Sequence, residues 1–206
     1  MLQFITHHTA QYSYLEGAMA ALNGGCKWIQ LRMKEASDSE VCQVAEVLKP
    51  ICKKNEAILV LDDRVELVAK LDLDGVHLGK NDMPIAEARK LIGEKYIIGG
   101  TANTFDDIKN IVAQGGDYIG VGPFRYTDTK HNLSPILGLD GYKNILSQCR
   151  ALGITTPLVA IGGIEIEDIP SIMSLGMSGI ALSGAILRSN NPIETTQNIL
   201  TTLNNL

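Results

Sequence analysis

Residues 28–62 read WIQLRMKEASDSEVCQVAEVLKPICKKNEAILVLD, and this stretch decides the fold. It begins with a largely apolar run, WIQLRM at 28–33, and ends with a second one, AILVLD at 57–62. The segment between them, 37–54, repeats apolar side chains at helical spacing. Those positions are Val41, Val44, Val47 and Leu48. The stretch therefore predicts a strand, a helix and a second strand that returns parallel to the first.

The same alternation continues through the rest of the chain. Further strand-like runs lie at 2–6, 75–79, 96–101, 118–123, 157–163 and 179–184. Further helix-like segments lie at 65–71, 85–92, 104–115, 139–153 and 167–176. Most of the strand-like runs are continuously apolar, as strands covered on both faces should be. Eight such strands predict a single (β/α)8 TIM barrel over residues 1–206, with an open doubly wound sheet as the alternative.

The helical segments carry ordinary end signals. Either Ser37 or Ser39 can act as the N-cap of segment 37–54, ahead of an acidic first turn. Pro170 is expected in the first turn of its helix. These signals support the predicted boundaries.

The composition excludes several classes of protein. With 45% hydrophobic and 20% charged residues and a net charge of −5, nothing indicates nucleic acid or an anionic membrane as a partner. No apolar run approaches the roughly 18 residues that a membrane span needs. No basic region followed by an apolar stretch marks a signal peptide, and the four cysteines form no CxxC pair. We therefore expect free thiols and a cytoplasmic location.

In a barrel of this kind, functional residues gather after the carboxyl ends of the strands. Gln30, Arg32 and Lys34 are spaced two apart, so they share one face of their strand. A charged side chain that begins inside an apolar strand is costly unless it is paired. If that face points inward, an amide and two cations meet at the barrel mouth; the alternative is two ordinary loop charges.

Carboxylates follow the next two strands. Asp62 and Asp63 end one strand, while His77 lies in the next strand and Asp82 follows it. Mg²⁺ uses one or two carboxylates and fills its other sites with phosphate oxygens and water, so these aspartates are candidate ligands. The alternatives are aspartates that cap helices and a histidine that belongs to the core.

The remaining strand ends carry hydroxyls and glycines. The loop GPFRYTDTK at 122–130 brings Thr127, Thr129 and Lys130 after the sixth strand, and Thr101 ends the fifth. Glycine turns follow the last two strands and let backbone N–H groups approach an anion. No GxGxxG or Walker sequence is present, which leaves a nucleotide cofactor without support. Together these ends predict two anion-attracting regions.

The chain resembles the thiamine-phosphate synthase family in six motifs that occur in the same order. They are QLRMK, LDDRVEL, DGVHLGKND, GPFRYTDTK, VAIGGI and GIALSGAI, and the resemblance spans residues 2 to about 187. It implies a (β/α)8 barrel that joins hydroxymethylpyrimidine diphosphate to a thiazole phosphate, with Mg²⁺ as cofactor and release of diphosphate.

The resemblance also implies roles for particular residues. The pyrimidine diphosphate would contact Gln30, Arg32, Lys34, Asp62, His77, Thr101 and Lys130. The catalytic charges would be Arg32, Lys34 and Lys130, and the Mg²⁺ ligands Asp63 and Asp82. The thiazole phosphate would be held by Thr127, Thr129, Gly163, Ser183 and Gly184. The chain departs from the family pattern at Asp62, Thr101, Lys80 and Gly184.

Two other functions fit parts of this pattern. A thiazole tautomerase of the same fold would need neither diphosphate nor metal, and a phosphate-binding barrel without catalysis would need only the glycine turns. Retention of the aspartates beside several cations favours the synthase. The sequence leaves the oligomeric state open, a homo-oligomer included.

Overall fold

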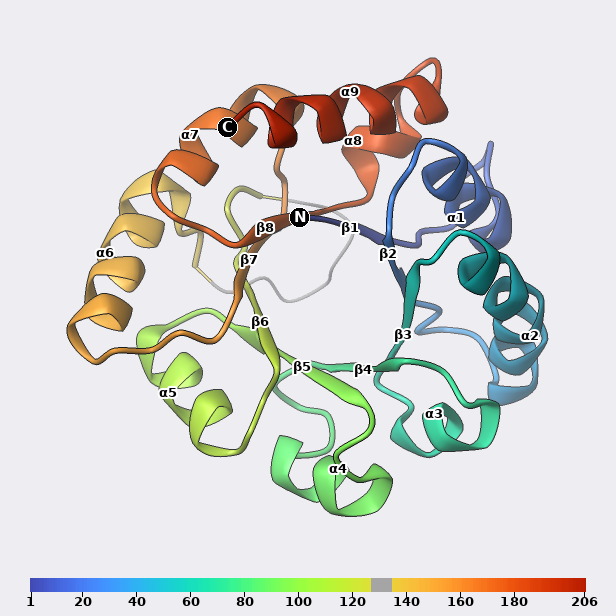
Figure 1. Cartoon of the computed structure of the whole chain (residues 1–206), viewed down its shortest axis with the longest axis horizontal. Helices are drawn as coiled ribbons and strands as arrows, with labels where there is room; N and C mark the ends of the chain where they lie inside the picture. The colour runs from blue at the N-terminus through green and yellow to red at the C-terminus, as the bar shows by residue number, and fades with distance from the viewer. Residues whose placement is uncertain (127–134) are drawn as a thin grey trace.

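A computed structural model describes residues 1–126 and 135–206 of the chain. Within these residues, eight parallel strands close into a barrel in sequence order, with the helices in a ring outside it (Figure 1). The strands are β1 (Leu2–Ile5), β2 (Trp28–Leu31), β3 (Ile58–Asp62), β4 (Gly75–Leu78), β5 (Ile97–Ala102), β6 (Tyr118–Val121), β7 (Leu158–Ile161) and β8 (Gly179–Leu182). The predicted barrel is confirmed, and the open sheet is excluded because β1 pairs with β8.

The helices cover the outside of the barrel. They are α1 (Tyr14–Asn23), α2 (Asp38–Lys54), α3 (Val65–Leu71), α4 (Ile85–Ile92), α5 (Phe105–Ala113), α6 (Gly138–Ala151), α7 (Ile169–Ser174), α8 (Gly184–Leu187) and α9 (Pro192–Asn204), with a 3₁₀ turn η1 (Ile166–Asp168) before α7. Helices α3 and α4 occupy the predicted ranges. The sequence analysis missed α1, α8 and α9, although Ser13 and Glu16 form a capping box that marks the start of α1.

The choice between two N-caps for α2 is settled by hydrogen bonds. Ser37 Oγ accepts the Glu40 N–H at 3.3 Å, and the Glu40 carboxylate accepts the Ser37 N–H at 2.8 Å. This reciprocal pair satisfies two backbone donors at the helix start. Pro170 lies in the first turn of α7, as predicted.

Side chains on each strand alternate between the helices and the barrel interior. Outward residues such as Phe4, Ile29 and Leu61 join the main hydrophobic core against the helices. Inside the barrel, a smaller apolar cluster consists of Ile5, Tyr118, Val159 and Ala181. The buried polar residues of the strands are Gln3, Gln30, Asp62 and His77. The interior is thus apolar on one side and polar on the other.

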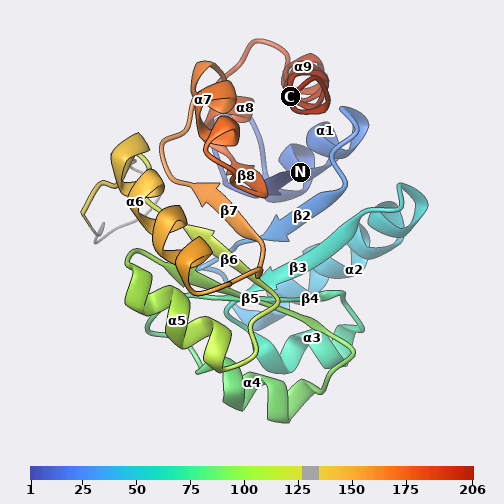
Figure 2. The same ribbon diagram turned by 60° about the vertical axis from the view of Figure 1, so that its left-hand side comes forward.

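The last helix closes the ring of helices at the junction of β8 and β1. Helix α9 contacts α1, α7 and α8, as Figures 1 and 2 show. No helix in the described ranges is long and apolar enough to cross a membrane. All four cysteines are free thiols, as expected.

One glycine makes room for the largest side chain inside the barrel. A Cβ added to Gly99 would lie 2.2 Å from the Tyr118 ring, which is 2% exposed. The indole of Trp28 packs edge-on against the same ring at 5.0 Å between centroids. Because the ring is enclosed, it cannot move aside.

Gly99→Ala should therefore destabilise the protein by about 1–3 kcal/mol, the usual cost of overpacking a core. Chemical denaturation measures this change in the free energy of unfolding. In a Tyr118→Leu background, the smaller side chain leaves space and the same substitution should cost less. An equal cost in both backgrounds would show that the contact with Tyr118 is not the cause.

Candidate active site

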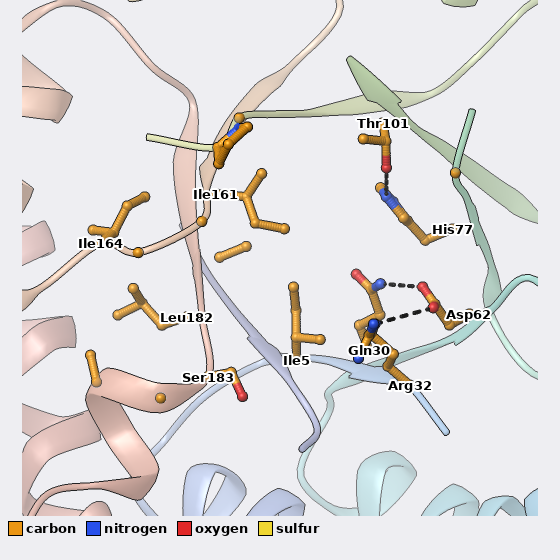
Figure 3. A pocket seen from close by; sticks show the side chains of 18 of the residues that line it. Ile5, Gln30, Arg32, Asp62, His77, Thr101, Ile161, Ile164, Leu182 and Ser183 are labelled. Carbon is orange, nitrogen blue, oxygen red and sulfur yellow. Dashed lines mark hydrogen bonds and ion pairs between the residues drawn. The ribbon is translucent and has the colours of Figure 1, made fainter. Parts of the chain in front are cut away.

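A pocket opens at the carboxyl ends of the strands (Figure 3). Many of the residues singled out in the sequence line it: Gln30, Arg32, Lys34, Asp62, His77, Thr101, Gly163, Ser183 and Gly184. Asp63 lies next to this set, in contact with Lys34, and Asp82 hydrogen-bonds to Asp63. Thr127, Thr129 and Lys130 lie outside the described residues.

A buried carboxylate, Asp62, lies at the end of β3. Its Oδ1 accepts a hydrogen bond from Gln30 Nε2 at 2.6 Å. Its Oδ2 lies 3.6 Å from Arg32 Nε and 3.7 Å from Lys34 Nζ, and it accepts no hydrogen bond within the described part of the chain. These ion-pair distances exceed hydrogen-bonding length, so both cations keep N–H groups for a ligand. Burial raises the pKa of Asp62, while Lys34 and Arg32 oppose that rise.

Lys34 also joins the neighbouring aspartates. Its Nζ lies 2.6 Å from Asp63 Oδ2, and the carboxyl groups of Asp63 and Asp82 hydrogen-bond to each other. Burial, the hydrogen bond to Asp82 and the charge of Asp62 raise the pKa of Asp63 to about 7. Burial would also raise the pKa of Asp82, but the hydrogen bonds from Asp63 and from the Gly79 N–H at 2.6 Å lower it. The pKa of Asp63 is thus raised and that of Asp82 lowered, which favours Asp63 as the holder of the shared proton.

This pair of carboxyl groups fits a divalent cation. A cation that replaces the shared proton would find two hard oxygen ligands, the number that Mg²⁺ takes when phosphate and water complete its shell. Over residues 1–126 and 135–206, no three or more His, Cys, Asp or Glu side chains cluster as a metal site. The remaining ligands would therefore come from a phosphorylated substrate or from water.

Asp63 has an unusual backbone conformation that directs its side chain. Its φ is 65°, in the left-handed region that non-glycine residues rarely adopt. Its N–H donates to the His77 carbonyl at 3.0 Å, which fixes the turn after β3 to β4. Strain of this kind is most often retained at functional sites.

A histidine and a threonine line the pocket wall next to Asp62, because β4 and β5 follow β3 in the barrel. His77 Nε2 lies 2.9 Å from Thr101 Oγ1, as Figure 3 shows, and its Nδ1 lies 2.9 Å from the Tyr118 hydroxyl. The side chain of Gln3 connects Tyr118 to Gln30 beneath the pocket. Thus His77 is buried with a protein partner at each ring nitrogen, and it also lines the pocket.

The other end of the pocket is built from glycine turns and one arginine. Gly163 has a φ of 65°, and an added Cβ would lie 2.6 Å from the Tyr126 carbonyl, so only glycine fits. The hydroxyl of Ser183 is buried and has no hydrogen-bond partner in the described ranges. Arg188 lies over Gly184, where an added Cβ would collide with the guanidinium, and pairs with Glu165 at 2.7 Å. A buried hydroxyl, open backbone and a cation suit a phosphate group.

Two charged residues near the mouth have structural partners. Lys80 pairs with Asp107 at 2.6 Å, so its charge is directed toward the start of α5. Arg125 forms a two-pronged ion pair with Asp168 at 2.8 and 2.9 Å and also donates to the Gly163 carbonyl at 2.8 Å. Arg125 therefore ties the loop after β6 to the glycine turn after β7.

Sequence reasoning missed several residues of this region. Gln3 and Tyr118 look like ordinary strand residues. Each lies two positions from another residue of its strand, Ile5 and Gly120, and so points to the same side of the barrel wall as that residue. Arg188 follows the C-terminal end of α8, and Glu165 lies in the loop before η1; both positions are beyond the strand ends that the sequence analysis considered. A search for polar residues on every inward position would have found Gln3.

Comparison with known proteins gives consistent matches. A family model described as thiamine monophosphate synthase matches residues 2–186. A thiamine-phosphate synthase of Bacteroides fragilis is 66% identical over 97% of this chain and 98% of its own length. One from Bacteroides thetaiotaomicron is 62% identical over 97% of this chain and 95% of its own.

Solved structures agree with these matches. Thiamine phosphate pyrophosphorylase from Pyrococcus furiosus superimposes with a TM-score of 0.87 at 28% identity, covering 99% of this chain and 95% of that one. A 3-hexulose-6-phosphate synthase, at 17% identity and a TM-score of 0.69 over 97% of this chain and 98% of that one, shares the fold alone.

The raised pKa of Asp63 predicts how stability depends on pH without metal. The unfolded carboxyl ionises near ~3.9, whereas the native pKa is about 7. Between these values the native state binds more protons than the unfolded state, so the free energy of unfolding should fall as pH rises. Asp63→Asn removes the titrating group, so this fall should become shallower in the variant.

Thermal unfolding in EDTA between about pH 4 and pH 7, the range between the two pKa values, measures the effect. Asp106→Asn, which changes an exposed carboxylate on α5, is the matched control and should keep the slope of the parent. A parent-like slope in Asp63→Asn would show that the shared proton does not reside on Asp63.

Proposed function

The chain belongs to the thiamine monophosphate synthase family, and we propose that its pocket joins a hydroxymethylpyrimidine diphosphate to a thiazole phosphate. The protein is thus an enzyme, a transferase acting on small molecules. The observation that carries the assignment to this pocket is its pairing of two anion-attracting regions. Arg32 and Lys34 line one side, and Gly163, Ser183 and Arg188 line the other. Two phosphorylated substrates need two such regions.

On the diphosphate side, Asp63 and Asp82 would hold Mg²⁺. The bound ion would neutralise part of the negative charge on the diphosphate. Arg32, Lys34 and Lys130 would bind the diphosphate oxygens, and the long ion pairs of Arg32 and Lys34 with Asp62 support this role. Lys34 would exchange its contact with Asp63 for one with the substrate.

The reaction needs charge stabilisation and positioning more than a nucleophile. Departure of diphosphate leaves a pyrimidine-methyl cation that the ring amino group stabilises, and the thiazole nitrogen then attacks the methylene carbon. Arg32 and Lys34 stabilise the charge that develops on the leaving group. The apolar side chains of Ile5 and Ile161 line the pocket and limit the access of water to the cation.

The two substrates would meet in the middle of the pocket. The pyrimidine half would contact Gln30, Asp62, His77 and Thr101. The thiazole phosphate would be held by Thr127, Thr129, Gly163, Ser183 and Gly184. We add Arg188 to this second group, because its guanidinium lies over Gly184 at the pocket wall. Close placement of both reactants supplies much of the rate.

The alternative function, a thiazole tautomerase, does not account for the carboxylate pair at Asp63 and Asp82. Isomerising a thiazole phosphate needs no carboxylate pair beside Lys34, whereas diphosphate departure does. A cytoplasmic location stays a prediction from the sequence, and the oligomeric state stays open, a homo-oligomer included.

The direct test is a coupled assay for diphosphate release with the purified protein. Release should require both substrates and Mg²⁺, because the leaving group needs its charge neutralised. EDTA should abolish it and added Mg²⁺ should restore it. Turnover that continues in EDTA, or the absence of any diphosphate release, would contradict the proposal.

Two substitutions should separate the two regions kinetically. Asp63→Asn should lower kcat by about 100-fold or more, as loss of an electrostatic stabiliser does. Arg188→Met should raise the KM for the thiazole phosphate by roughly tenfold, the effect of one charge-assisted hydrogen bond, and leave the KM for the pyrimidine diphosphate unchanged. Arg150→Met, on the far end of α6, is the control for removal of a surface arginine. Equal effects of Arg188→Met on both KM values would contradict the division.

A further inference from the structure

A series of hydrogen-bonded polar side chains runs through the barrel interior beneath the pocket, from the end of β3 through β2, β1 and β6 to β4 and β5. Its members are Asp62, Gln30, Gln3, Tyr118, His77 and Thr101. We propose that Gln3 is a positioning residue that holds the His77 imidazole as the neutral Nε2–H tautomer. Through that tautomer, the Thr101 hydroxyl becomes a hydrogen-bond donor to the substrate.

The donor-to-acceptor direction of these hydrogen bonds is set at Asp62. A carboxylate only accepts, so Gln30 turns its Nε2 toward Asp62 Oδ1, at 2.6 Å. Burial raises the pKa of this carboxyl group and the cations near Oδ2 oppose that rise, but the orientation of Gln30 depends only on Oδ1, which accepts the Gln30 hydrogen bond. Gln30 Oε1 then points the other way and accepts a hydrogen bond from Gln3 Nε2 at 3.1 Å. The orientation of both amides therefore follows from this one acceptor.

Gln3 links this orientation to Tyr118 on the other side of the barrel interior, through a second hydrogen bond from its amide. Its Nε2 has two hydrogens; one goes to Gln30 and the other to the Tyr118 hydroxyl at 3.2 Å. The Tyr118 hydroxyl is buried and already accepts from Gln3, so its own hydrogen needs an acceptor. Among the described residues, His77 Nδ1 at 2.9 Å is its partner. Leaving that hydrogen unpaired would cost about 1–3 kcal/mol, so Tyr118 donates to His77.

The tautomer of His77 follows. A neutral imidazole has one N–H, and because Nδ1 accepts, the hydrogen must be on Nε2. Nε2 then donates to Thr101 Oγ1 at 2.9 Å. With its oxygen engaged in this way, the Thr101 hydroxyl hydrogen is directed to the pocket that the residue lines.

This arrangement gives the pocket a preference before any substrate arrives. A fixed donor at Thr101 favours a substrate that presents an acceptor there, such as a ring nitrogen or a phosphate oxygen, and disfavours one that presents a donor. Threonine and serine would serve equally, since each supplies a hydroxyl. This consequence for the substrate rests on the proposed function; the tautomer itself does not.

The test is NMR of the ligand-free protein labelled with ¹⁵N-histidine. Long-range ¹H–¹⁵N spectra at alkaline pH report which ring nitrogen carries the hydrogen. We expect His77 in the parent to be protonated at Nε2. In Gln3→Met, which keeps the volume but removes the donor, the Tyr118 hydroxyl is free to accept from Nδ1–H, so the Nε2–H fraction should fall.

Two further variants make the outcome decisive. Trp28→Phe alters packing against the same Tyr118 ring without touching a hydrogen bond of the chain, so its His77 should keep the parent tautomer. Tyr118→Phe removes the donor to Nδ1 and should change the tautomer as Gln3→Met does, which keeps the test intact if Gln3→Met fails to fold. A parent protonated at Nδ1 would overturn the proposal, as would Gln3→Met and Tyr118→Phe with unchanged tautomers.

Kinetics provide the second readout. Gln3→Met should lower kcat/KM for diphosphate release by about tenfold, as loss of one ordinary hydrogen bond would, whereas Trp28→Phe should not reproduce this loss. A tautomer change in a protein that releases no diphosphate would support the role of Gln3 and refute the proposed function. If the parent enzyme releases diphosphate but the variants keep the parent tautomer, the proposed function is supported and the role of Gln3 is refuted.

Discussion

The burial of one charge, that of Asp62, governs the polar half of the barrel. The residue is 3% exposed, and a carboxylate in such a place is stable only beside compensating charges. Arg32 and Lys34 supply them from the adjacent strand end, at 3.6 and 3.7 Å. The charged groups of Arg32 and Lys34 therefore lie in the pocket at the barrel mouth, where an anionic substrate can reach them. The same carboxylate orients Gln30, and through it the polar chain below the pocket.

A second consequence concerns the neighbouring carboxylates. Lys34 contacts Asp63 at 2.6 Å, yet burial and the hydrogen bond with Asp82 raise the pKa of Asp63 to about 7. When the carboxyl groups of Asp62, Asp63 and Asp82 are all ionised, they exceed the two cations Arg32 and Lys34 by one charge. That excess would draw a divalent cation in place of the shared proton. The glycine turns at the other end carry no such excess, so the two regions differ in chemistry.

The barrel could be predicted because each strand and helix is encoded locally, in runs such as AILVLD and in the apolar stripe of α2. The grouping of Gln30, Arg32 and Lys34 was also readable, since a two-residue spacing fixes one face of a strand. The ion-pair partners of the charged side chains could not be predicted from the sequence. The pairing of Arg125 with Asp168, or of Lys80 with Asp107, depends on loop paths between elements. The place of the Tyr118 ring inside the barrel likewise depends on a neighbouring strand, because Gly99 makes the space that the ring fills.

The central claim is that the strand-end carboxylates hold a metal ion against a diphosphate. Anomalous diffraction from crystals soaked with Mn²⁺ and inorganic diphosphate tests it most directly. We predict a metal peak bonded to Asp63 and Asp82, with diphosphate density that reaches Arg32 and Lys34. A metal peak located elsewhere, or diphosphate bound at those cations with no metal at the aspartates, would contradict the account.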